Sequence, residues 1–156
     1  MTSTSGTGKP QIKPGATFDG PSKTLNDSHF LLFSGITGDV HPIHYDVEYA
    51  KQTRFGKPLA HGLLLASMTA LGATTARDQI DGLVFLEQGC RFIKPAVVGD
   101  TIRPRLTLEK IWHEGHRTFY RFTTVMFNQH GDILLEGFHV YRAFEHQKNL
   151  PSKETP

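Results

Sequence analysis

Residues 61–77 read HGLLLASMTALGATTAR and are apolar on nearly every face of a helix. A helix without a polar face must be surrounded by protein. The wider stretch 59–76 has no Asp, Glu, Lys or Arg, yet its hydroxyl side chains, histidine and glycines set it apart from a bilayer span of about 20 mostly apolar residues. The pattern therefore predicts a long buried helix from His61 to about Arg77, at the centre of the fold.

The chain after this helix has the composition of β-strands separated by turns rich in Gly, Asp and Pro. The predicted strands cover residues 83–94, 100–112, 117–127 and 133–144. The second of them alternates clearly, and its apolar face is expected to carry Ile102, Leu106, Leu108 and Trp112. Connections of hairpin length imply that neighbouring strands pair in antiparallel fashion.

Two shorter helices are expected before the central one. Asn26 or Asp27 is placed to cap a helix whose end is marked by Gly35 and Gly38, and Asp46 is placed to cap a second helix over 47–53. One all-round apolar helix followed by antiparallel strands predicts an α+β fold in which a curved sheet wraps the helix. Such a sheet leaves an edge to protect, so we expect two copies to pair edge to edge in a homodimer or higher oligomer.

The composition is typical of one soluble globular domain. We expect a folded body over residues 16–144, a disordered tail over 1–15 and a flexible tail over 145–156. The 17 basic and 15 acidic residues leave a formal charge of only +2, and no run of basic residues occurs, which argues against nucleic-acid binding.

The lone cysteine and the N-terminal composition suggest a cytoplasmic protein that does not insert into membranes. Cys90 cannot form an intramolecular disulfide and is expected to be a small buried residue in a strand. Residues 1–16 contain almost nothing apolar and do not resemble a secretory signal.

A carboxylate and an imidazole lie close together in the segment before the central helix. Asp39 and His44 flank Pro42, which stiffens the loop between them. A carboxylate beside an imidazole can orient a water, remove its proton and return a proton elsewhere. The spacing alone leaves open a plainer interpretation, in which Asp39 caps a turn and His44 is an ordinary loop histidine.

Gly62 would begin the central helix, where a backbone amide is free and points at any bound group. A thioester oxygen that gains negative charge would be stabilised there, and His61 is grouped with Gly62 as an oxyanion and substrate-binding candidate. A glycine is equally suited to close packing of helix against sheet.

Other polar residues of this region are weaker candidates. His41, His44 and His61 with Asp39 or Asp46 could suggest a metal site, but their spacing matches no common ligand pattern, so no metal is expected. Ser67 lacks a nucleophile motif and is expected to hydrogen-bond back to its helix. His41 and Ser67 are retained as possible modulators of the site.

Three segments resemble the hydratase-2 motif of MaoC-like dehydratases and (R)-specific enoyl-CoA hydratases. They are FSGITGDVHPIH over 33–44, AHGLL over 60–64 and RFIKPAVVGDT over 91–101. The resemblance spans roughly residues 16–144 and implies a hotdog fold, with a central helix wrapped by an antiparallel sheet. It also implies that Asp39 and His44 form a catalytic pair and that the Gly62 amide is the oxyanion donor.

The implied reaction is reversible hydration of a trans-2-enoyl thioester to an (R)-3-hydroxyacyl thioester. The expected partner is an acyl-CoA or acyl-carrier-protein thioester, and no separate cofactor is expected because coenzyme A belongs to the substrate. Two residues depart from the motif: His41 stands where Asn is usual, and Ala70 where some relatives have serine. A hotdog thioesterase and a non-catalytic acyl-thioester-binding protein therefore remain as alternatives.

Overall fold

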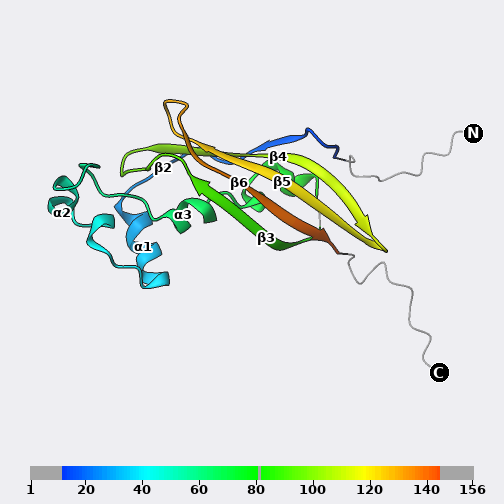
Figure 1. The fold of residues 1–156 in the computed structure, drawn as a ribbon, viewed down its shortest axis with the longest axis horizontal. Helices are drawn as coiled ribbons and strands as arrows, with labels where there is room; N and C mark the ends of the chain where they lie inside the picture. The colour runs from blue at the N-terminus through cyan, green and yellow to red at the C-terminus, as the bar shows by residue number, and fades with distance from the viewer. Residues whose placement is uncertain (1–11, 81, 145–156) are drawn as a thin grey trace, which may run out of the picture.

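The computed structural model describes residues 12–80 and 82–144, which form an antiparallel sheet with short helices packed against it (Figure 1). The main strand order is β1-β4-β5-β6-β3, and β2 pairs with β4. The strands are β1 Thr17–Asp19, β2 Lys23–Thr24, β3 Leu83–Phe92, β4 Thr101–Glu114, β5 Arg117–Phe127 and β6 Ile133–Ala143. The four long strands and their antiparallel pairing confirm the α+β prediction.

The two helices expected before the central one are present and lie at one end of the sheet (Figure 1). Helix α1, Asp27–Thr37, begins at Asn26, whose side chain accepts a hydrogen bond from the His29 amide. It ends at Gly38, whose φ of 77° lies in the left-handed region that glycine adopts most easily. Helix α2, Val47–Lys51, begins at Asp46 as predicted.

The central helix is much shorter than predicted. Helix α3 covers only Gly62–Ser67, and the chain continues through two 3₁₀ turns, Leu71–Ala73 and Thr75–Asp78. The Ser67 and Thr69 hydroxyls donate to the carbonyls of Leu64 and Ala66, and the Thr69 amide also bonds three residues back. Hydroxyl groups that bond the backbone in this way compete with the α-helical ladder, which explains the early end.

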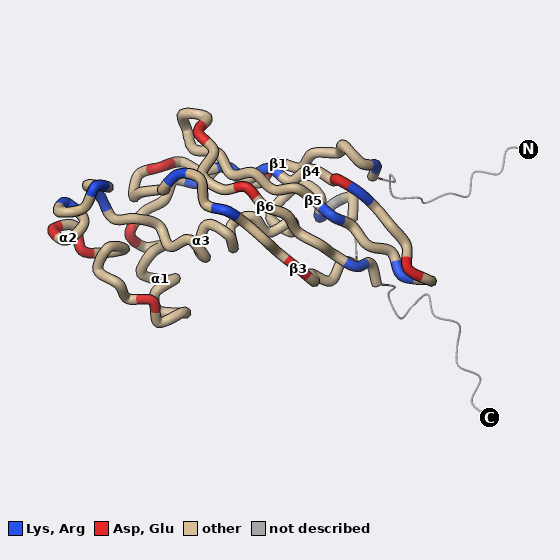
Figure 2. The backbone as a smooth tube through the Cα atoms, in the orientation of Figure 1, with Lys and Arg blue, Asp and Glu red and all other residues tan. Residues whose placement is uncertain are grey.

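Burial around α3 also differs from the all-round burial that was predicted. Leu64, Leu65 and Ala66 are buried against the sheet, whereas Leu63 is 71% exposed. The helix carries no charged residue (Figure 2). None of the helices in the described ranges has the length and apolar character needed to cross a membrane.

A β-bulge corrects the predicted face of β4. Ile102, Leu106 and Leu108 point into the core as expected, but the register shifts between Leu108 and Lys110. Beyond this shift Ile111 packs on the core, and Trp112 instead stacks on Phe119 with ring centroids 5.1 Å apart. The extra residue of a bulge reverses the alternation, which a strict period of two cannot anticipate.

Cys90 is not buried as predicted. Cys90 is exposed, because its neighbour across the β3–β6 pair is Gly137, which has no side chain to cover it.

The predicted tails over 1–15 and 145–156 lie largely outside the described residues, but Ile12 packs on the core and the Gly15 amide donates to the Leu108 carbonyl. Residues 12–15 are therefore part of the described fold.

A buried polar chain ties the end of α3 to strand β6. Thr69 Oγ1 lies 3.0 Å from His139 Nε2, and His139 Nδ1 lies 3.2 Å from the Tyr141 hydroxyl. All three residues are buried, and burial lowers the pKa of His139 to about 4. His139 is therefore neutral at pH 7, with one N–H and one lone pair.

The low pKa of His139 makes the stability of the fold depend on pH. The unfolded chain binds a proton on this residue below about pH 6.5, whereas the folded chain resists it down to about pH 4. The free energy of unfolding is therefore highest above pH 6.5 with respect to this group. It decreases as the pH falls from 6.5 toward 4, by roughly 3 kcal/mol in total. We expect His139→Gln to flatten the dependence of unfolding free energy on pH in this window.

The measurement is urea unfolding at several pH values between 4 and 7. A His116→Gln control makes the same replacement at the exposed turn between β4 and β5. Identical slopes for the wild type and His139→Gln would contradict the assignment of the effect to His139.

Candidate active site

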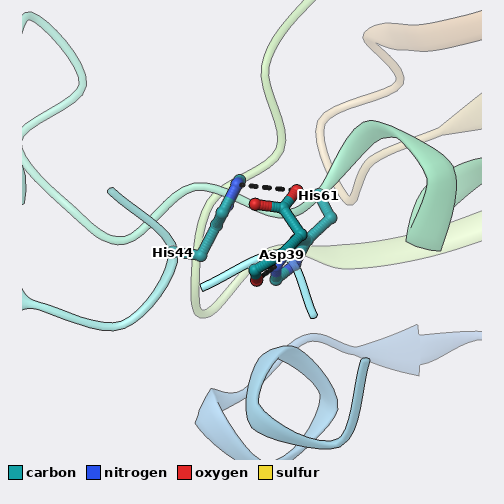
Figure 3. Close-up of side chains that lie close together, drawn as sticks. All are labelled: Asp39, His44 and His61. Atoms are coloured by element: carbon teal, nitrogen blue, oxygen red, sulfur yellow. Dashed lines mark hydrogen bonds and ion pairs between the residues drawn. The ribbon is translucent and has the colours of Figure 1, made fainter. Parts of the chain in front are cut away.

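Asp39 and His44 come from the loop that joins α1 to α2. Asp39 directly follows the Gly38 turn, and its amide donates to the Thr37 hydroxyl. His44 ends a 3₁₀ turn, Pro42–His44, which His41 caps by accepting from the Ile43 amide. The loop thus has its own local hydrogen bonds, and it brings the two candidate side chains to face each other (Figure 3).

The hydrogen positions on His44 follow from its neighbours. Nδ1 lies 2.7 Å from the Leu59 carbonyl, which can only accept, so Nδ1 carries a hydrogen. In the neutral ring Nε2 then presents a lone pair, and it lies 3.8 Å from Asp39 Oδ2. That separation is too long for a direct hydrogen bond but lets one water oxygen contact both atoms.

The two side chains differ in their access to solvent. The His44 side chain is 12% exposed and that of Asp39 is 52% exposed. The imidazole is therefore largely covered by protein, whereas the carboxylate borders open space from which a ligand can approach. The pair has the chemistry for taking a proton from a shared water and returning one to a substrate atom.

His61 lies behind His44 and supports both members of the pair. The two rings are stacked, with centroids 3.6 Å apart and planes at 18°. His61 Nε2 lies 3.2 Å from the Asp39 carbonyl oxygen and 3.1 Å from Ser34 Oγ. Because that carbonyl can only accept, Nε2 carries the hydrogen and His61 fixes the backbone of Asp39. Its burial, at 2% exposure, is unlike that of a residue that contacts substrate directly.

The pKa of His61 is lowered chiefly by burial. Its hydrogen bond to the Asp39 backbone raises the pKa, whereas its proximity to the His44 imidazole lowers it. His61 is therefore neutral at pH 7, and its Nδ1 lone pair is buried without a partner among the described residues. No role for Ser34 was predicted, although it lies one turn after the buried Phe30 and is therefore a polar residue on an apolar helix face.

Gly62 combines the two features predicted as alternatives, a free backbone amide at the start of a helix and close packing of that helix against the sheet. It is the first residue of α3, no side chain caps this end, and its amide has no hydrogen-bond partner among the described residues. The Phe92 ring also packs on it, since a Cβ at this position would lie 2.9 Å from Phe92 Cζ. The glycine thus allows close packing and leaves a donor free beside His61.

The two possible modulators occupy peripheral positions. His41 is exposed, caps its turn, and has its ring centroid 6.4 Å from that of His44. Ser67 Oγ donates to the Leu64 carbonyl, as predicted, and borders a cavity of about 330 Å³.

Asp39, His44 and His61 could also suggest a metal site, since they each offer a ligand atom within 4.8 Å of the others. Metal ligation requires lone pairs that converge on one point. The rings of His44 and His61 are nearly parallel, so their in-plane lone pairs run side by side. Acid–base chemistry suits this arrangement better than ligation does.

Comparison with known proteins identifies the same region. The family model described as "MaoC like domain" matches residues 9–126. An (R)-specific enoyl-CoA hydratase of Rhodospirillum rubrum is 29% identical over 116 residues, which cover 74% of this chain and 78% of that protein. A mitochondrial 3-hydroxyacyl-[acyl-carrier-protein] dehydratase of Solanum lycopersicum is 26% identical, over 74% of this chain and 68% of that protein.

A solved structure extends the match to the fold. The (R)-hydratase from A. caviae involved in PHA biosynthesis superposes with a TM-score of 0.75 at 26% identity, covering 85% of this chain and 97% of that chain. The expected hotdog arrangement is therefore confirmed. Two of the three sequence segments that suggested it contain Asp39, His44 and Gly62. The fold brings Asp39 and His44 together and stacks His61, the neighbour of Gly62, on His44.

His61 is expected to position Asp39 and His44 without contacting the substrate, and this role can be tested by substitution. His61→Phe keeps a ring against His44 but removes the donor to the Asp39 carbonyl, so the carboxylate should lose its fixed place. We expect kcat to fall by about 10- to 100-fold with little change in KM, because small misplacements of reacting groups are costly.

His29→Phe is the matched control, since His29 lies on α1 and caps its first turn. A His61→Phe variant with unchanged kcat would contradict the positioning role. A parallel melting curve separates this effect from a general loss of fold.

Proposed function

The chain belongs to the MaoC-like family of hydratases and dehydratases, and from that premise we propose that it reversibly hydrates trans-2-enoyl thioesters to (R)-3-hydroxyacyl thioesters. The observation that carries the proposal is the approach of His44 Nε2 to Asp39 Oδ2 at 3.8 Å. The relatives named as hydratases and dehydratases support the reaction class. At identities below 30%, the direction and the precise substrate are part of the proposal.

The proposed reaction uses one water bound between the pair. In hydration its oxygen bonds to C3 of the enoyl group, while the pair accepts one proton from the water and delivers one to C2. The pair therefore ends each cycle in its starting protonation state. The hydrogen bond from His44 to Leu59 keeps Nε2 aimed at the water, with its lone pair free at the start of each cycle. General acid–base assistance of this kind contributes about 10²- to 10⁴-fold to a rate.

The Gly62 amide is the proposed donor to the thioester carbonyl. Addition at C3 pushes electrons toward this oxygen, and the unpaired amide at the start of α3 would stabilise the negative charge. A cavity of about 290 Å³ borders Gly62 and Phe92 and has Arg54 and Lys94 on its walls. Arg54 suits the phosphate groups of either coenzyme A or an acyl carrier protein, whereas Lys94 is already paired with Asp132. No further cofactor enters the proposal.

The proposed active unit is a homodimer. Strand β3 ends the strand order and pairs only with β6 among the described strands. It also has large apolar side chains at 39–50% exposure, namely Val84, Phe85, Leu86 and Phe92. An apolar edge strand is a site for pairing with another chain, and a second copy would cover it.

The reaction is tested with purified protein and trans-2-butenoyl-CoA or longer homologues. We expect the enone absorbance to fall and chiral analysis to find the (R)-3-hydroxyacyl ester. Asp39→Asn and His44→Ala should each lower kcat by at least about 10²-fold without changing the melting temperature appreciably, because each removes one member of the pair.

Asp46→Asn is the matched control for the carboxylate, since asparagine can still cap α2. Full activity in either Asp39→Asn or His44→Ala would refute the proposed pair. Release of free thiol in place of a hydroxyacyl ester would indicate a thioesterase, and tight ester binding without turnover would indicate a non-catalytic binding protein.

A further inference from the structure

A second cavity lies at the other end of α3, between this helix and strands β3 and β6. Its volume is about 330 Å³, within the range of small-molecule sites. Most of its wall is apolar, yet two buried polar side chains also line it. Its lining includes Ala66, Ser67, Phe85, His139 and Tyr141.

The cavity is placed to receive the far part of an acyl chain. Ala66 lies one helical turn beyond Gly62 on the same face of α3, and Ser67 lies about 7.5 Å from Gly62 along the axis. On the sheet side, β3 passes from Phe92, which contacts Gly62, to Phe85, which lines the cavity. An acyl group whose thioester lies at Gly62, as the proposed function requires, can therefore extend toward this cavity.

The hydrogens of the polar chain beside the cavity can be assigned by elimination. Thr69 donates its only hydroxyl hydrogen to the Ala66 carbonyl at 2.6 Å, so it accepts from His139 Nε2–H. The neutral ring then has a lone pair at Nδ1, and this nitrogen accepts from the Tyr141 hydroxyl at 3.2 Å. The order of donation is Tyr141 to His139 to Thr69 to the backbone.

This order leaves acceptors, and no free hydroxyl hydrogens, facing the cavity. The Tyr141 hydrogen is committed to His139, and the Ser67 hydrogen is committed to the Leu64 carbonyl at 2.7 Å. Reversing the chain so that Tyr141 donates to a ligand would break the short bond from Thr69 to Ala66. A ligand that itself donates a hydrogen is therefore favoured.

We propose that this cavity selects acyl thioesters with a hydroxyl group toward the end of the acyl chain, and that this hydroxyl donates to the Tyr141 phenol oxygen. Tyr141 is only 8% exposed, and its oxygen already interacts with the Leu71 backbone, so an alkyl chain of the same length would shield its second lone pair from water without replacing the hydrogen bond that a hydroxyl group supplies. One net neutral hydrogen bond corresponds to a preference of roughly three- to tenfold.

The test measures binding with saturated esters, which cannot be hydrated. Calorimetry compares octanoyl-CoA with the ester of equal length that ends in a hydroxyl group. We expect the hydroxyl-ended ester to bind roughly three- to tenfold more tightly. Equal binding, tighter binding of octanoyl-CoA, or no binding of either ester would each overturn the proposal, and none of these comparisons requires a variant.

Three variants assign the preference to a residue. Tyr141→Phe should abolish it, while Tyr120→Phe removes the same hydroxyl from the residue paired with Tyr141 on β5, outside the cavity, and should retain it. Ser67→Ala should also retain it. Loss of the preference in Ser67→Ala or Tyr120→Phe, or its persistence in Tyr141→Phe, would overturn the assignment to Tyr141.

Turnover of the matching trans-2-enoyl esters is measured separately. A binding preference without turnover would leave the cavity assignment standing and remove the proposed reaction. Turnover without a binding preference would leave the proposed reaction standing and remove the cavity assignment.

Discussion

The hydrogen bond from His44 Nδ1 to the Leu59 carbonyl is the interaction on which the site depends. It is one of a reciprocal pair, because the Leu59 amide also donates to the Ile43 carbonyl at 3.0 Å. Leu59 in turn forms a β-bridge with Val97, in the segment that follows β3. The loop with both candidate side chains is thereby attached to the sheet, and the ring nitrogen that faces Asp39 is left without a hydrogen.

Two buried histidines serve the structure in different ways. Both have pKa values lowered by burial, so both are neutral at pH 7. His61 is stacked on His44 and bonds the Asp39 backbone, so it fixes the geometry of the proposed pair. His139 connects Thr69 with Tyr141, so it determines which hydrogen-bonding groups the second cavity offers. Burial thus keeps the ring neutral at each end of α3, and the hydrogen-bond partners determine which nitrogen carries the hydrogen.

The sequence predicted well where local signals decide the structure. Strand bounds follow alternation and glycine turns, and the ends of α1 follow the capping preferences of Asn26 and Gly38. It failed where a single residue alters a periodic pattern. Hydroxyl groups at Ser67 and Thr69 end α3 early, and one bulge moves Trp112 off the core face.

The candidate site could be recognised in part. Asp39, His44 and Gly62 lie within the segments that resemble the family motif, so the resemblance was enough to select them. The burial of His61 behind His44 could not be read from the chain, because it depends on α1 supplying Ser34 from a distant position. The polar chain through His139 was equally hidden, since it joins residues that are about 70 positions apart.

The most direct test is ¹⁵N NMR of the His44 imidazole in the free protein, at a pH where the ring is neutral. We expect a hydrogen on Nδ1 and a bare Nε2, because the Leu59 carbonyl can only accept. A hydrogen on Nε2 would contradict it, since the nitrogen that faces Asp39 could then no longer take a proton from a shared water.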